Sequence, residues 1–201
     1  GIIHDWEFAF QGRTSEVVRK NVSEGKFGIW QETGFYLNLA IVAGAYQGLG
    51  YGESVGRMIL NEGLEIPSTD SLYKTAANAA VSDPEKASAA IDFAGFISKF
   101  GLKPGFMEIR HPYKNFSVQA AACETGIPLT GHPMIGHDII YNHPANHGAA
   151  VGRTALRDFL SFAGSVLGID HYGASAPYKV IFERFGFTVE NVVARAKALI
   201  S

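Results

Sequence analysis

Apolar residues recur at intervals of three and four along much of the chain, which is the spacing of one buried face of an α-helix. This pattern predicts helices over residues 35–46, 84–100, 116–124, 149–166 and 188–200. Shorter apolar runs are interpreted as strands because turn-forming residues bound them, and they lie at residues 1–3, 127–130 and 167–172. Strands that alternate with longer helices predict a layered α/β fold with a largely parallel sheet, and we expect a single domain over residues 1–201.

The segments between these elements carry weaker patterns. Residues 65–80 are polar and irregular, with a weak helix near their end, and residues 104–113 are interpreted as a loop or an edge strand. The run from Gly48 to Gly52, GLGYG, is similar to a nucleotide-binding glycine loop, but its spacing is wrong and it follows a helix rather than a strand. We therefore expect a helix-to-helix turn there.

Composition narrows the class of protein. Apolar residues make up 47% of the chain, as in globular proteins, and no apolar run reaches the roughly 18 residues that a membrane span requires. The net charge of −2 and the scattered Lys and Arg residues argue against a nucleic-acid partner. The single cysteine, Cys123, fits a small buried residue in a reducing, cytoplasmic compartment. The chain starts at Gly1 on an apolar run, which fits a processed protein or a piece of a longer one.

The strongest chemical signal lies in residues 123–153. This segment holds four of the seven histidines, which are His132, His137, His143 and His147. A predicted strand, a glycine-rich loop and a helix follow one another here, and open α/β folds bind ligands where a strand ends in such a loop. His137 and Asp138 are therefore candidate catalytic residues, since an imidazole titrates near neutral pH and can act as an acid or a base.

Two other interpretations of these histidines stay open. Four imidazoles and Asp138 could bind a metal ion, but Pro144 and Gly148 argue against a regular helix around His143 and His147, so we expect no metal. The histidines could also be structural and form hydrogen bonds with loop carbonyl groups.

Candidate cofactor-binding residues lie at two further strand ends. His4 and Asp5 follow the first predicted strand, with a surface turn as the alternative. Gly173 and Ser175 offer backbone amides and a hydroxyl group where a turn enters a helix, and the alternative is a tight strand-to-helix turn. We expect all of these residues to face one crevice at one edge of the sheet.

Residues 1–165 resemble the deoxyhypusine synthase-like family. The resemblance rests on the order and spacing of the segments GIIHDWEFAFQGRT, KFGIWQETG, FSVQAAACETGIPLTGHPMIGHDIIYNHP and HGAAVGRTALRDFLSF. It implies a three-layer Rossmann-like fold, NAD as the cofactor, a homo-oligomer, and transfer of an aminobutyl group from a small-molecule amine. The family's catalytic lysine segment has no counterpart here. Lys179, the nearest lysine, lies in no matching motif, so the group that would form an imine with the substrate is missing.

Residues 168–200 resemble the C-terminal tail of transketolases, through the segment GIDHYGASAPYKVIFERFGFTVENVVARAKALI. In that family the tail belongs to a small α/β domain without thiamine diphosphate. The two resemblances lead to two hypotheses. The chain is an NAD-dependent deoxyhypusine synthase-like transferase or a degenerate homologue, or it is a non-catalytic structural domain of the transketolase C-terminal type, including a fused or designed chain.

Overall fold

The computed structural model describes residues 14, 16–165 and 177–199. It divides into two compact units, residues 1–158 and residues 159–201, and each is described by itself. The expectation of a single domain stays a prediction.

The helices of unit 1 are α2 (Val18–Ser23), η1 (Trp30–Phe35), α3 (Tyr36–Gln47), α4 (Tyr51–Leu60), α5 (Thr69–Ala79), α6 (Pro84–Phe100), η2 (Lys114–Phe116), α7 (Val118–Thr125), η3 (Ile139–Asn142) and the first part of α8 (Gly148–Ser165).

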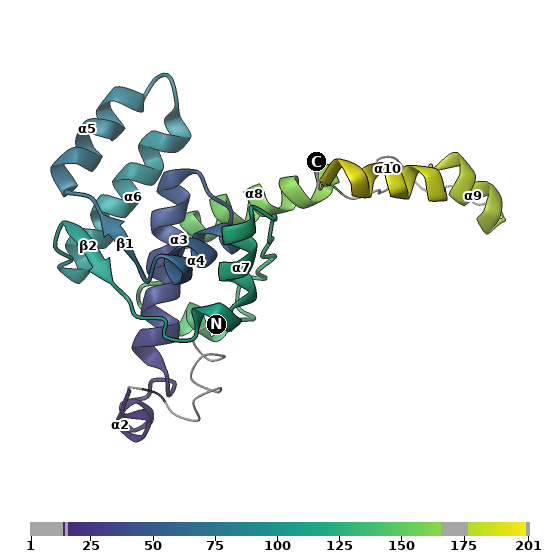
Figure 1. Cartoon of the computed structure of the whole chain (residues 1–201). Helices are drawn as coiled ribbons and strands as arrows, with labels where there is room; N and C mark the ends of the chain where they lie inside the picture. The colour runs from purple at the N-terminus through teal and green to yellow at the C-terminus, as the bar shows by residue number, and fades with distance from the viewer. Residues whose placement is uncertain (1–13, 15, 166–176, 200–201) are drawn as a thin grey trace. The chain divides into compact units, whose positions relative to one another are not determined.

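Helix α3 is the centre of unit 1. Its eight consecutive residues from Leu37 to Gly44 are all buried, so the helix is covered on every side. Helices α4 and α6 pack directly against it, and α5 and α6 lie side by side as a pair of neighbouring helices (Figure 1). A helix that is apolar around its whole circumference is stable only when such neighbours surround it.

Small residues allow the helices of unit 1 to approach one another closely. A side chain at Gly44 of α3 would overlap Ser54 of α4, and one at Gly56 of α4 would overlap the carbonyl oxygen of Gln119 on α7. These glycines keep α4 in contact with both of its neighbours, and larger residues would force the backbones apart.

The expected three-layer Rossmann-like fold with a largely parallel sheet is wrong. Within the described residues the strands are β1 (Gly63–Ile66) and β2 (Gly105–Glu108), which form one antiparallel pair with Gly63 opposite Glu108. The apolar run 127–130 is irregular and exposes 63% of Ile127, and residues 139–142 form the 3₁₀ helix η3. An apolar run forms a strand only if a partner strand satisfies its backbone groups, and in the part of the chain that the structure describes neither of these runs pairs with a strand. The runs at residues 1–3 and 167–172 lie outside the described residues.

The helix limits were predicted best where end signals are strong. Helix α6 begins after Asp83, whose carboxylate accepts a hydrogen bond from the Lys86 backbone at 3.0 Å, and it ends at Gly101 with a left-handed φ of 61°. The weak helix expected near the end of residues 65–80 is present as α5, but it is longer than predicted, and the end of β1 precedes it where irregular structure was expected. Only Leu72 and Ala76 of α5 are buried, four residues apart, which explains the weak pattern.

The described residues of unit 2 form the end of α8 and two further helices, α9 (Tyr178–Arg184) and α10 (Val189–Leu199). The predicted start of α10 is confirmed, since the hydroxyl oxygen of Thr188 accepts a hydrogen bond from the Asn191 backbone at 3.3 Å. The predicted apolar stripe of this helix is exposed to solvent at Val189 and Val192. None of the described helices is both long enough and apolar enough to cross a membrane.

Candidate functional site

The glycine-rich run is a helix-to-helix turn, as predicted. Gly48 ends α3 with a left-handed φ of 74°, and Gly50 immediately precedes α4. The carboxylate of Asp158, on α8, lies against the start of α4 and is 5% exposed. One of its oxygens accepts hydrogen bonds from the backbone N–H groups of Gly52, at 2.9 Å, and Gly131, at 2.6 Å. The positive end of α4 therefore already holds an anion, which would repel the phosphates of a nucleotide.

Asp158 joins three segments that are far apart in the sequence, and the sequence did not predict this role. The spacing in the sequence does indicate that Asp158 is buried, because it continues the buried face of α8 that contains Ala150, Val151 and Thr154. A charged residue on a buried helical face needs a partner, so its position alone indicates a buried hydrogen-bonding site.

The predicted catalytic residues His137 and Asp138 lie directly before η3. His137 is exposed, and the Asp138 carboxylate accepts a hydrogen bond from the backbone N–H of Ile140 at 3.2 Å, which caps η3. Burial, and then the charge of Asp138, raise the pKa of Tyr51, so this phenol stays protonated at neutral pH. In the structure Asp138 caps η3, and a catalytic role for His137 and Asp138 stays a prediction.

His143 lies in an aromatic cluster and is 5% exposed. Its ring centroid lies 4.5 Å from that of Trp30 and 6.0 Å from that of Phe35. Its Nδ1 accepts a hydrogen bond from the backbone N–H of Ala145 at 3.0 Å, so the ring proton lies on Nε2. Burial lowers the pKa of His143 to about 4, which keeps the imidazole neutral at neutral pH.

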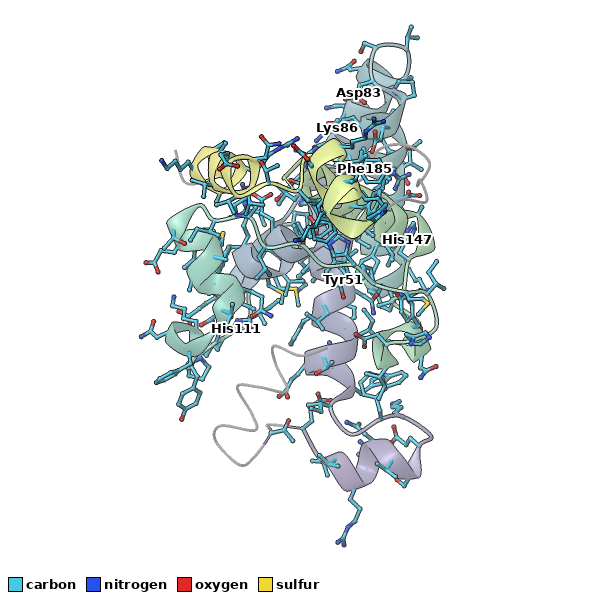
Figure 2. The ribbon with its side chains drawn as sticks, turned by 90° about the vertical axis from the view of Figure 1, so that its right-hand side faces the viewer. Tyr51, Asp83, Lys86, His111, His147 and Phe185 are labelled. Carbon is cyan, nitrogen blue, oxygen red and sulfur yellow. The ribbon has the colours of Figure 1, made fainter. Side chains whose placement is uncertain are left out.

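The other two histidines of the segment also make local contacts. Nδ1 of His147 accepts a hydrogen bond from the backbone N–H of Ala150 at 3.3 Å and thereby caps the start of α8. His132 contacts the hydroxyl group of Thr130 at 3.0 Å. Among the described residues, no group of three or more His, Cys, Asp or Glu side chains is placed to hold a metal ion. His147 and the buried His111 lie in separate regions of unit 1 (Figure 2).

Polar side chains also fix the histidine-bearing segment onto the core. The buried amide of Asn38 donates hydrogen bonds to the carbonyl groups of Gly34, at 2.7 Å, and Ile140, at 3.1 Å, and accepts one from Asn146 at 3.2 Å. Arg153 of α8 forms an ion pair with Asp92 of α6 at 2.6 Å, so its guanidinium already has an anionic partner. These contacts position residues 139–153 as part of the packed structure.

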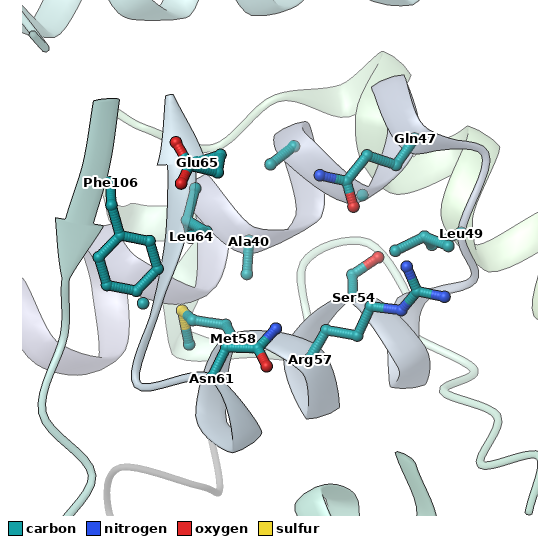
Figure 3. A pocket seen from close by; sticks show the side chains of 13 residues that line it. Ala40, Gln47, Leu49, Ser54, Arg57, Met58, Asn61, Leu64, Glu65 and Phe106 are labelled. Atoms are coloured by element: carbon teal, nitrogen blue, oxygen red, sulfur yellow. The ribbon is translucent and has the colours of Figure 1, made fainter. Parts of the chain in front are cut away.

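A pocket of about 270 Å³ lies between α3, α4 and the β1–β2 pair (Figure 3). Its polar lining includes Ser54, whose hydroxyl donates to the carbonyl of Gly50, and Arg57, which pairs with Glu53 at 2.7 Å. His137 and Asp138, the predicted site residues that the structure describes, do not line it. The predicted cofactor residues His4, Asp5, Gly173 and Ser175 lie outside the described residues, so the expectation that they face one edge of a sheet is untested. Among the described residues there is no parallel sheet that could provide this edge.

Comparison with known proteins gives short matches. A transketolase of Halalkalibacterium halodurans is 65% identical over 37 residues, and transketolases of Bacillus subtilis and Escherichia coli are 54% and 48% identical over 43 and 42 residues. The chain contains a transketolase-like segment. The segment covers 18–21% of this chain, and its length fits the resemblance of residues 168–200.

The transketolase-like segment is only a small part of its relatives. The chain spans about 6% of the length of these transketolases, so their activity does not transfer with the segment. No protein-family model matches the chain, and no solved structure matches it. Nothing in these comparisons supports the resemblance of residues 1–165 to the deoxyhypusine synthase-like family.

Proposed function

We propose that this chain is a non-catalytic structural module that assembles with a second copy of itself. The observation that carries the proposal concerns residues 118–139, which contain the predicted catalytic residues. The Asp138 side chain forms a local hydrogen bond with Ile140, while several large apolar side chains of the segment face solvent.

Exposure of apolar side chains favours an interface over residues 118–139. Four large apolar residues of this segment are at least 60% exposed, and these are Val118, Ile127, Met134 and Ile135. A concentration of exposed apolar side chains within one segment is typical of an interaction site. Removing such side chains from water would contribute roughly 25 cal/mol per Å² of buried apolar surface.

The low charge of the same segment favours a second copy as the partner. Residues 118–139 contain only two charged residues, Glu124 and Asp138, and both are acidic. A two-fold symmetric contact brings each patch against its own copy, so like charges meet like charges. A nearly uncharged patch tolerates this arrangement, and a patch dense in one sign of charge would not.

Substitution of Ile135 by aspartate is expected to weaken self-association at least about tenfold, because it buries a carboxylate without a partner at the interface. Sedimentation velocity across a concentration series up to about 0.1 mM measures the change. Val81→Asp is the matched control, since Val81 is 96% exposed in the turn between α5 and α6 and should leave association unchanged. A wild-type protein that stays monomeric throughout the series contradicts the proposal.

Replacement of His137 by glutamine is expected to change the free energy of unfolding by less than about 0.5 kcal/mol, because the side chain is exposed. Asp138→Ala should cost about 1 kcal/mol through loss of the cap on η3. Urea unfolding measures both values.

NAD and an amine substrate stay predictions of the alternative, transferase function. Thermal unfolding of the wild type with millimolar NAD, and separately with spermidine, tests them. We expect no shift of the midpoint from either compound. A shift with NAD that is lost in the Asp138→Ala variant would favour the transferase over the structural module.

A further inference from the structure

A second pocket, of about 380 Å³, opens beside His143. Four segments of unit 1 converge on it, which are η1, the end of α6, β2 and the turn after η3. Its lining consists of Trp30, Gln31, Phe35, Phe100, Leu102, Met107, His143 and Pro144. The volume falls within the usual range for small-molecule sites, and contributions from several elements hold the walls in place.

The walls favour a flat and uncharged ligand. All eight described lining residues are uncharged at neutral pH, and four of them carry aromatic rings. The Phe35 and Phe100 ring centroids are 5.1 Å apart with planes at 70°, and the tilted Trp30 and His143 rings are 4.5 Å apart. Ring faces and edges in such arrangements bind another aromatic ring through stacked and edge-to-face contacts.

Charged groups of both signs lie near the pocket. The ammonium group of Lys99 donates a hydrogen bond to the carbonyl of Pro144 at 2.6 Å and lies 5.2 Å from the centroid of the Phe100 ring. Phe100 and Pro144 both line the pocket. Lys99 would repel a cationic ligand, but the charge of Glu16 acts on His143 in the opposite sense and would attract one, so these charges do not select against an amine.

His143 supplies one directional polar group to the lining. Because its Nδ1 accepts from Ala145, its Nε2 carries the proton, and no residue described in the structure accepts a hydrogen bond from that N–H. The Trp30 indole and the Gln31 amide of the lining are donors as well, so this mostly apolar pocket favours ligands that carry a hydrogen-bond acceptor.

We propose that this pocket binds an uncharged, planar bicyclic heteroaromatic ring that carries a hydrogen-bond acceptor for Nε2 of His143. The aromatic lining holds the ring system, and the imidazole N–H distinguishes rings with an acceptor nitrogen from rings without one. This binding is independent of self-assembly through residues 118–139, since none of the lining residues belongs to that segment.

Quinoline and indole are matched probes, because both are bicyclic and of similar size, while quinoline has an acceptor nitrogen and indole has a donor N–H. Titration of each into the full chain near neutral pH, followed by shifts in protein NMR spectra, gives both dissociation constants. We expect quinoline to bind at least about fivefold more tightly than indole, which corresponds to one hydrogen bond. Equal affinities, or no saturable binding of quinoline up to about 10 mM, overturn the proposal.

Trp30→Ala removes one wall and is expected to weaken quinoline binding at least about tenfold. Phe106→Ala is the control, since Phe106 lines the other pocket and should leave binding unchanged. Unaltered binding in Trp30→Ala, or equal losses in both variants, contradicts this location. If Trp30→Ala does not fold, the comparison of the two probes on the wild type still decides the proposal.

Discussion

Asp158→Ala is expected to lower the free energy of unfolding by about 3 kcal/mol. The carboxylate is buried and accepts hydrogen bonds from the backbone N–H groups of Gly52 and Gly131. Its removal leaves two buried donors without a partner, each of which costs about 1–3 kcal/mol, and removes an anion from the start of α4. Unfolding in urea, followed by circular dichroism, measures the loss.

Two variants separate this role from a general effect of changing α8. Asp158→Asn keeps one acceptor oxygen in the same place and loses the charge, so we expect about half of the loss. Leu156→Ala changes an exposed residue of the same helix, 58% exposed, and should alter stability by less than about 0.5 kcal/mol. A loss below about 1 kcal/mol in Asp158→Ala would show that Gly52 and Gly131 find other acceptors.

Acidification is expected to destabilise the fold by about 3 kcal/mol between about pH 7 and pH 4.5, because two buried histidines are neutral in the folded state. Burial lowers the pKa of both His111 and His143 from 6.5 to about 4. Between those values the unfolded chain binds more protons than the folded chain, so the free energy of unfolding falls as the pH falls from 6.5 towards 4. Above about pH 7 these residues contribute no pH dependence.

The two imidazoles resist protonation for different local reasons. Nδ1 of His111 donates to the carbonyl of Ile109 at 2.7 Å, so a second proton would have to lie on Nε2 of a fully buried ring. Nδ1 of His143 accepts from Ala145, and protonation would remove this acceptor. Each unit of pKa corresponds to about 1.4 kcal/mol of free energy. The expected loss of about 3 kcal/mol is smaller than the free energy that both pKa shifts would give together, because partial access of solvent weakens the effect.

Urea unfolding at several pH values measures this dependence. His111→Gln and His143→Gln should each remove about half of it, and the exposed His137→Gln should leave it unchanged. Lys114 and the backbone of His111 lower the pKa of the Glu62 carboxyl, so that group destabilises the fold only at lower pH as it becomes protonated. Measurements above about pH 5 therefore isolate the histidines. A double variant with the wild-type profile would contradict this assignment.

The helices could be predicted from the sequence because their signals are local. Asp83 and Gly101 limit α6, Gly126 ends α7 with a left-handed φ of 69°, and Thr188 caps α10. The sheet could not be predicted in this way, because a strand depends on a distant partner. The run 127–130 has the composition of a buried strand, yet Ile127 is 63% exposed, whereas the less regular residues 63–66 pair with residues 105–108.

The predicted site rested on a related assumption. His137 and Asp138 were linked to catalysis through a strand end that does not exist among the described residues. Asp158 and Asn38, which organise the polar interior, carry no motif, and their roles depend on contacts across about a hundred residues. Only the placement of a polar side chain on a buried helical face indicates such residues from sequence.

The central position of α3 has a consequence for synthesis of the chain on the ribosome. The amide of Asn38 is satisfied in part by Ile140 and Asn146, which follow it by 102 and 108 residues. At translation rates of roughly 5–20 residues per second, those partners emerge about 5–20 seconds after the helix that needs them. During that interval part of the apolar surface of α3 is exposed to solvent. The nascent chain must therefore rely on chaperones or on transient contacts with its own earlier segments.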